Sequence, residues 1–200
     1  MIQLYDNALS ANCFKVKLLL TQLEIPFTTK EVSVLGDRDK DRGSEFFAKN
    51  PIGKIPTAVL EDGTAIGESL ALLAYFAEDT RFLPTGRLER ARVFQWLAFE
   101  QNNLEPTLAV ARHLIGHRGY KPGAELLSVW TEGGNRVLRI LDGWLQDHDW
   151  LACDRYTIAD IACFGYTHCC EEGPFSLEPY PAVRAWIERV KSTDRFVPMG

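Results

Sequence analysis

The chain has 200 residues, of which 46% are hydrophobic and 24% are charged, and its formal net charge is −5. This composition is that of an ordinary globular protein, with room for a sizeable core in one or two domains. The negative charge argues against general nucleic-acid binding. No apolar run approaches the roughly 18 residues of a transmembrane helix. We therefore expect neither nucleic acid nor membrane among the partners.

The first residues, Met1 to Asp6, contain neither a basic segment nor a cleavage site, so we expect no signal peptide. The cysteines are odd in number and follow no secretory pattern, which favours free thiols in a reducing compartment. We therefore expect a cytoplasmic protein. The five cysteines are Cys13, Cys153, Cys163, Cys169 and Cys170.

The first quarter of the chain predicts a strand, a helix and a second strand, which implies that the two strands pair in parallel. Pro26 ends the helix, because the residue before a proline is pushed out of α geometry. Lys15 and Lys17 interrupt the apolar pattern of this helix with charge. The predicted segments are strands over 2–4 and 27–34, then a polar loop over 36–43 and a short helix over 44–49.

The stretch from Asn50 to Ser69 predicts a hairpin that leads into a helix. Asp62-Gly63 separates two short β-prone runs, which is the strongest local signal for a hairpin. We expect Ser69 at the N-cap of the following helix, where its hydroxyl, the free N–H groups and the helix dipole favour an anion. Glu68 offers a carboxylate for an amine. On spacing alone, an ordinary capped helix explains the same residues.

After Leu83-Pro84-Thr85-Gly86, a boundary that contains proline and glycine, every segment reads as helix. The helix that starts at Thr157 is apolar almost all round and should be buried. Asp160 is placed to return the hydrogen bond of a Thr157 N-cap, with Tyr156 and Ile161 at the staple positions. We interpret this group as structural, not catalytic. The other helices are expected over 88–114, 123–145 and 181–191.

The segment N-P-I-G-K-I-P over 50–56, followed by Glu68-Ser69, resembles the glutathione-binding half of the cytosolic glutathione transferases. The segment from Thr157 to Ile161 resembles the capping box in that family's buried central helix. The resemblance implies an α/β plus all-α protein. Residues 1–80 would form a thioredoxin-like domain with a mixed four-stranded sheet, and residues 87–200 an all-helical domain that lines the second-substrate site.

The resemblance also implies a glutathione site. In this family a cis-proline precedes the third strand, and the residue before it pairs its backbone with the cysteinyl part of glutathione. A Glu/Gln-Ser pair holds the γ-glutamyl end. These roles would fall to Pro56, to Ile55, and to Glu68 with Ser69.

Basic residues near this stretch are candidates for the glycyl carboxylate of glutathione. Lys54 would pair with it, as similar sequences suggest, although an exposed turn lysine is an equally good interpretation. Arg38 and Arg42 are weaker candidates, because the loop that carries them does not align residue by residue with the family.

Ser10 precedes the first helix, where a hydroxyl is first of all an N-cap. The segment S-A-N-C-F-K-V matches the place where theta-like and bacterial members carry the residue that faces the glutathione sulfur. The resemblance implies that Ser10 hydrogen-bonds the thiolate and that Asn12 is a second donor. Cys13 is a rival nucleophile, which would make the enzyme a thiol-exchange catalyst. Tyr5 is a weaker candidate as thiol partner; otherwise both residues are packing.

Two histidine-containing groups have alternative interpretations. His168-Cys169-Cys170 before Glu171-Glu172 suggests a metal, but neighbouring residues on a helix diverge by about 100°. No second ligand pair has zinc-like spacing, so we expect no metal. His113 and His117 fit a solvated helix face, or the mouth of an electrophile site.

We predict a theta-like, Ser-type glutathione S-transferase that joins glutathione, as co-substrate, to a small hydrophobic electrophile. The resemblance implies a homodimer with a role in detoxification. A glutathione-dependent disulfide reductase or isomerase is one alternative, and a non-catalytic glutathione-binding protein of the same fold is another. The second substrate is left open, because such pockets are built from variable apolar side chains.

Overall fold

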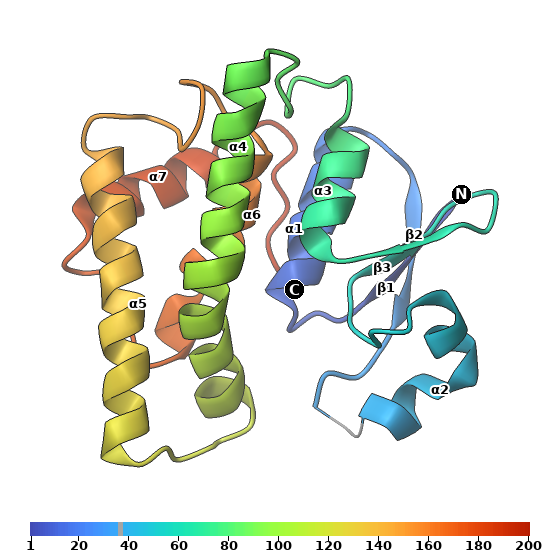
Figure 1. Ribbon diagram of the computed structural model, residues 1–200, viewed down its shortest axis with the longest axis horizontal. Helices are drawn as coiled ribbons and strands as arrows, with labels where there is room; N and C mark the ends of the chain where they lie inside the picture. Colours follow the sequence, from blue (N-terminus) through green and yellow to red (C-terminus); the bar gives the residue numbers. More distant parts are fainter. Residues whose placement is uncertain (36–37) are drawn as a thin grey trace. The chain divides into compact units, whose positions relative to one another are not determined.

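The computed structural model describes residues 1–35 and 38–200, and the side chains of all of these except 38–41. The chain divides into two compact units (Figure 1). The first comprises Met1–Glu78 and Asp194–Gly200, and the second Asp79–Thr193. Within the described part of the chain, no helix combines the length and apolar character needed to span a bilayer.

The first unit holds a four-stranded mixed sheet with strand order β2-β1-β3-β4. β1 and β2 are parallel, as predicted, and the other two pairs are antiparallel. Helices α1 and α3 lie on one face of the sheet and α2 on the other, which is the expected thioredoxin-like arrangement (Figure 1). The elements are β1 (Ile2–Asp6), α1 (Ala11–Gln22), β2 (Phe27–Glu31), α2 (Arg38–Lys49), β3 (Thr57–Val59), β4 (Ala65–Gly67) and α3 (Ser69–Ala77).

The register of the sheet brings three segments that are distant in sequence to the same end of the sheet. Tyr5 near the end of β1 lies opposite Thr57 at the start of β3. Thr57 in turn lies opposite Gly67 at the end of β4. The loop after β1, the residues before β3 and the residues after β4 therefore meet at the same end of the sheet.

Three predicted boundaries in this unit are wrong. The first strand extends to Asp6, and the second ends at Glu31 instead of residue 34. α2 begins at Arg38, inside the predicted polar loop, because charged residues such as lysine and arginine are good helix formers. Gly43, with φ of 64° and ψ of 167°, breaks this helix, and the short helix predicted over 44–49 is its second part. Residues 36 and 37 of the predicted loop lie outside the described residues.

The two lysines that interrupt the pattern of α1 have different environments. Lys17 forms an ion pair of 2.9 Å with Asp6 and keeps part of its side chain in solvent. Lys15 is completely buried, with 0% exposure, beside core residues such as Phe14 and Leu18. α1 is therefore buried on more sides than its charge pattern suggests.

The second unit is helical throughout its regular elements. The helix predicted over 88–114 is a run of α4 and two π-helical segments, with Pro106 inside the first of them. A proline removes an α-helical hydrogen bond, which fits the wider winding here. The elements are α4 (Arg87–Phe99), η1 (Glu100–Ala109), η2 (Arg112–His117), α5 (Ala124–Leu145), α6 (Ile158–Thr167), the 3₁₀ segment η3 (Cys170–Glu172) and α7 (Pro181–Lys191).

The buried helix α6 starts with the predicted capping box. Thr157 Oγ1 accepts a hydrogen bond from the Ala159 N–H at 3.2 Å, and the Thr157 N–H donates to Asp160 Oδ2 at 3.0 Å. Asp160 Oδ1 also accepts from the Leu151 N–H and from the Trp186 indole. Both oxygens of the Asp160 carboxylate thus accept hydrogen bonds from backbone and core groups, which confirms that Asp160 has a structural role.

Candidate functional site

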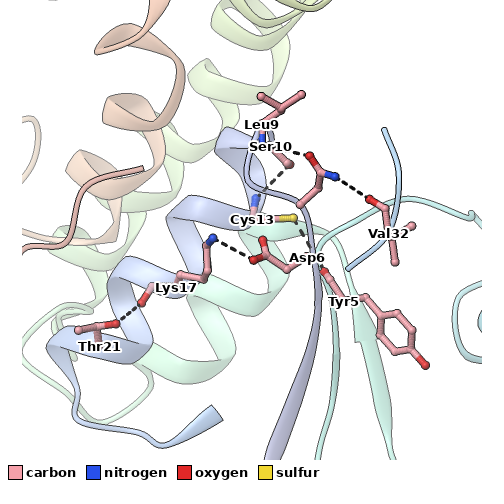
Figure 2. Close-up of polar contacts among 9 residues, drawn as sticks. Tyr5, Asp6, Leu9, Ser10, Cys13, Lys17, Thr21 and Val32 are labelled. Atoms are coloured by element: carbon pink, nitrogen blue, oxygen red, sulfur yellow. Dashed lines mark hydrogen bonds and ion pairs between the residues drawn. The ribbon is translucent and has the colours of Figure 1, made fainter. Parts of the chain in front are cut away.

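Ser10 caps α1 from the loop after β1 (Figure 2). Its backbone is extended, with φ of −91° and ψ of 106°, and its Oγ accepts a hydrogen bond from the Cys13 N–H at 3.3 Å. Its own N–H donates to Asn7 O at 3.0 Å, which closes the loop. The cap uses the hydroxyl oxygen as an acceptor, so the half-buried hydroxyl keeps its own proton to donate.

Cys13 is held in the core, one turn further along α1. Its thiol has 0% exposure and points at Tyr5 O, with 3.9 Å between Sγ and the oxygen (Figure 2). Burial raises the pKa of Cys13 to about 12. The thiolate, which is the nucleophilic form, is therefore suppressed near neutral pH. The geometry favours the packing interpretation of this residue.

Tyr5 lies on the other side of β1. Its ring packs edge-on against Phe46, with 4.8 Å between centroids, in a cluster that includes Val32. Figure 2 shows the ring extending away from Ser10 and Cys13. Tyr5 therefore faces α2, and not the loop where a thiol would lie.

Asn12 and Ser69 join the N-termini of α1 and α3. Ser69 Oγ donates to Asn12 Oδ1 at 3.2 Å, and Lys15 Nζ donates to the same oxygen at 2.7 Å. The prediction that Ser69 is the N-cap of α3 is wrong by one residue. Ser69 is the first helical residue and Glu68 occupies the cap position, without a side-chain cap hydrogen bond. The Ser69 hydroxyl is therefore turned toward α1.

Glu68 has a backbone conformation that non-glycine residues seldom adopt, with φ of 66° and ψ of 120°. Such conformations cost on the order of 1–3 kcal/mol and gather at ligand sites. The side chain is exposed at the N-terminus of α3. A carboxylate held there is accessible to an amine.

The peptide bond between Ile55 and Pro56 is cis, as the family resemblance implies. Asn50 holds the loop before it: Nδ2 donates to Lys54 O at 2.9 Å and to Thr57 Oγ1 at 2.8 Å, while Oδ1 accepts from the Ile52 N–H. Sequence patterns did not predict this role of Asn50, because no local motif indicates its two backbone partners or the hydroxyl of Thr57. The asparagine before Pro51 was the available signal.

Gly67 at the end of β4 also depends on Asn50. A Cβ at Gly67 would lie 2.8 Å from Asn50 Nδ2, so only glycine leaves room for this side chain. The loop before β3 and the residues before Glu68 are therefore packed together through one amide.

The basic candidates differ in their surroundings. Lys54 is exposed. The Arg42 guanidinium donates to Gly53 O, so it contacts the backbone of the loop. The side chain of Arg38 lies outside the described residues.

Together, the candidate site residues form a polar surface at one end of the sheet. Two helix N-termini contribute positive potential there. The hydroxyls of Ser10 and Ser69, the amide of Asn12 and the carboxylate of Glu68 lie beside them, and cis-Pro56 immediately precedes β3. This arrangement suits a peptide-like ligand that carries both an amine and a carboxylate.

His113, His117 and His168 in the second unit contact neighbouring side chains. His117 Nε2 lies 3.6 Å from Glu172 Oε2, a carboxylate that also pairs with Arg112 at 2.8 Å. His113 accepts from Arg118 at 3.0 Å, and burial lowers the pKa of both histidines. The ring of His168 stacks on Phe164 with 4.4 Å between centroids. In the part of the chain that the structure describes, no group of three or more possible ligands is arranged for a metal.

A separate cavity of about 750 Å³ lies within the second unit, between α4, α5 and the loop after α5. Aromatic side chains, including Trp96, Trp144 and His148, line it together with Arg92 and Arg139. None of the residues predicted for glutathione lies in this cavity.

Comparisons with known proteins agree with this picture. Family models for the N-terminal and C-terminal domains of glutathione S-transferase match residues 9–79 and 113–194. The disulfide-bond oxidoreductase YfcG of Escherichia coli is 32% identical over 96% of this chain and 91% of its own length.

Solved structures extend the similarity. A glutathione S-transferase from Pseudomonas fluorescens is 40% identical, with a TM-score of 0.93 over 99% of this chain and 98% of its own. A glutathione transferase family member from the same species, with two glutathione bound, is 26% identical, with a TM-score of 0.83 over 97% and 89% of the two chains.

Proposed function

Because this chain belongs to the glutathione S-transferase family, we propose that it joins the thiolate of glutathione to a small hydrophobic electrophile. The observation that carries the proposal is the meeting of the N-termini of α1 and α3 with the cis Ile55-Pro56 bond at one end of the sheet. This chemistry would serve detoxification, because it removes reactive electrophiles.

Glutathione would bind along this edge through its two ends and its backbone. The free N–H groups at the N-terminus of α3, where Ser69 is the first helical residue, suit the γ-glutamyl carboxylate, and the exposed carboxylate of Glu68 suits the amine. The backbone of Ile55, beside β3, would pair with the cysteinyl part. Lys54, exposed in the same loop, would reach the glycyl carboxylate.

Ser10 and Asn12 would stabilise the sulfur as an anion. A thiol of pKa about 8.5 is only about 3% ionised near pH 7. Lowering that pKa by about two units takes about 2.7 kcal/mol. One charge-assisted hydrogen bond from the Ser10 hydroxyl, together with the dipole of α1, supplies a free energy of this size.

The reaction then needs little from the protein beyond positioning and this stabilisation. The thiol proton leaves to solvent, the sulfur forms a bond to the electrophilic carbon, and the leaving group departs with the electron pair of the broken bond. No side chain of the protein becomes covalently modified.

A second candidate function is the reduction of mixed disulfides. The similarity to a protein named a disulfide-bond oxidoreductase favours it. Since Cys13 is fully buried, the attacking sulfur would again belong to glutathione. It would attack the glutathione sulfur of a mixed disulfide, release the other thiol and leave oxidised glutathione.

The test is a direct comparison of the two reactions with the purified protein and glutathione. Turnover of an aryl halide above the uncatalysed rate supports conjugation, whereas turnover of a small mixed disulfide supports the reductase. Glutathione binding without either reaction would assign the chain to the non-catalytic alternative. Absence of glutathione binding would refute the proposal.

We extend the proposal to assembly and location. Exposed apolar side chains such as Tyr75 on α3 and Trp144 on α5 are surfaces that a second copy would cover in a homodimer. Light scattering of the purified chain tests the dimer. All five cysteines are free thiols, which supports a cytoplasmic, reducing location.

A further inference from the structure

Lys15 is an ammonium group in the core of the first unit. Its exposure is 0%, and a buried charge is costly unless hydrogen bonds compensate for its lost hydration. Its Nζ lies 2.7 Å from Asn12 Oδ1, on the preceding turn of α1. Lys17, two residues on, forms an ion pair with Asp6 and remains partly exposed. The two lysines therefore serve different purposes.

The contact with Lys15 determines how the Asn12 amide is oriented. An ammonium carries only donors, so the atom that faces it must be the amide oxygen. Ser69 Oγ donates to the same oxygen at 3.2 Å. The NH₂ group of Asn12 therefore lies on the other side of the amide. Without these donors, the amide would be free to turn its oxygen, an acceptor, in that direction.

We propose that Lys15 is a positioning residue for the thiolate of bound glutathione, because it holds Asn12 so that the amide presents N–H donors and not an acceptor. The proposal rests on the proposed function. The ammonium also polarises the amide, which strengthens its N–H groups as donors in a site of low dielectric. An anionic sulfur beside Asn12 is then stabilised, whereas an amide oxygen in the same place would repel it.

The experiment compares Lys15→Met with Lys17→Met. Methionine keeps most of the length of the buried side chain and removes the donor and the charge. Glutathione affinity is measured by calorimetry, and the pKa of the bound thiol by the ultraviolet absorbance of the thiolate across pH. We expect Lys15→Met to raise the pKa of the bound thiol by about one unit, equivalent to about a tenfold loss of turnover near pH 7. Affinity should stay within a few-fold, and Lys17→Met should match the wild type.

A double-mutant cycle shows whether Lys15 acts through Asn12. The effects of mutations at residues that act as one unit are not additive. In an Asn12→Ala background, Lys15→Met should therefore change the pKa of the bound thiol little further. Full additivity of the two changes would overturn the positioning role, and so would an unchanged thiol pKa in folded Lys15→Met.

Two further measurements keep the result unambiguous. Lys15→Leu also removes the donor and the charge, with a shorter apolar side chain, so it gives the answer if Lys15→Met does not fold. A raised thiol pKa in folded Lys15→Leu supports the proposal, and a wild-type pKa contradicts it. Failure of the wild type to bind glutathione would remove the proposed function itself. If the wild type and the Lys15 variants lower the pKa of the bound thiol equally, the proposed function stands and only the positioning role of Lys15 is refuted.

Discussion

Ser69 Oγ lies 3.2 Å from Asn12 Oδ1, so one hydrogen bond joins the N-termini of two helices whose contacting residues are 57 positions apart in sequence. Each helix N-terminus carries partial positive charge and unpaired N–H groups. Their convergence beside cis-Pro56 gives the site a positive potential that neither helix would supply alone. The hydroxyl of Ser69 thereby contributes to the architecture of the site.

The first prediction concerns the γ-glutamyl end of glutathione. Glu68→Ala or Ser69→Ala should weaken binding by about 1–3 kcal/mol. Glu68→Ala removes the carboxylate that would hold the amine, and Ser69→Ala removes the hydrogen bond to Asn12 that joins the two helix N-termini. Calorimetric titration of the folded variants measures this loss. Glu61→Ala is the matched control, since Glu61 is an exposed carboxylate that pairs with the chain's N-terminus. Unchanged affinity in both site variants would show that glutathione binds elsewhere.

The second prediction separates Ser10 from Cys13. Ser10→Ala should raise the pKa of bound glutathione and cut turnover near pH 7 by about tenfold or more, on the order of 1.4 kcal/mol. Affinity should remain within a few-fold, because the other edge of the site holds the glutathione backbone. The rate should partly recover at high pH, where the thiol ionises without help. The measurement is the pH–rate profile.

Cys13→Ala is the companion variant in that experiment. It should retain most of the activity toward electrophiles, because the Cys13 thiol is buried and its pKa is raised to about 12. An inactive Cys13→Ala beside a normal Ser10→Ala would mean that the mechanism is thiol exchange through the protein's own cysteine.

Local patterns predicted those parts of the fold that depend on neighbours in sequence. The Asp62-Gly63 hairpin is present, with the Thr64 N–H bound to Asp62 Oδ1 at 2.9 Å. The capping box of Thr157 with Asp160 follows from a spacing of three residues. Both motifs are closed by interactions within a few residues, so composition and spacing are enough to identify them.

Interactions across the fold were not predictable in this way. From the sequence, Lys15 was interpreted as a charged residue that interrupts an apolar helix. Its burial could not be predicted, because it depends on how α1 packs in the folded unit. The sequence predicted Ser69 as the N-cap, whereas Glu68 occupies the cap position with a positive φ. No sequence pattern indicates this shift of one residue. The roles of Asn12 and Asn50 likewise depend on partners that only the sheet register brings close.

The third prediction concerns chemical labelling of the thiols. In the folded protein, iodoacetamide should modify the half-buried Cys153 first and leave Cys13 unmodified. Burial raises the pKa of both thiols, but Cys13 in addition has no access to the reagent. Mass spectrometry of proteolytic peptides gives the extent of labelling at each site. All five cysteines should react in denaturant, which is the control. Labelling of Cys13 as fast as Cys153 in the native state would contradict this account.

The fourth prediction concerns the pH dependence of unfolding through Asp160. Burial raises the pKa of its carboxyl to about 6, even though the N–H groups of Leu151, Thr157 and Trp186 favour the ionised form. An aspartate in the unfolded chain has a pKa of about 3.9. The folded state therefore binds this proton more tightly. Its contribution to stability is fully present below about pH 4 and is lost as the pH rises through about 6.

Asp160→Asn removes this titration and keeps one acceptor oxygen. We expect the free energy of unfolding of the wild type to fall, relative to that of the variant, by up to roughly 3 kcal/mol between about pH 4 and pH 7, since each pKa unit is worth 1.36 kcal/mol. Denaturant unfolding at a series of pH values measures the difference. Ser10→Ala, which loses a cap in the other unit and keeps Asp160, should differ from the wild type by a nearly constant amount. A difference between wild type and Asp160→Asn that stays constant or grows in favour of the wild type with rising pH would show that folding does not raise the pKa of Asp160.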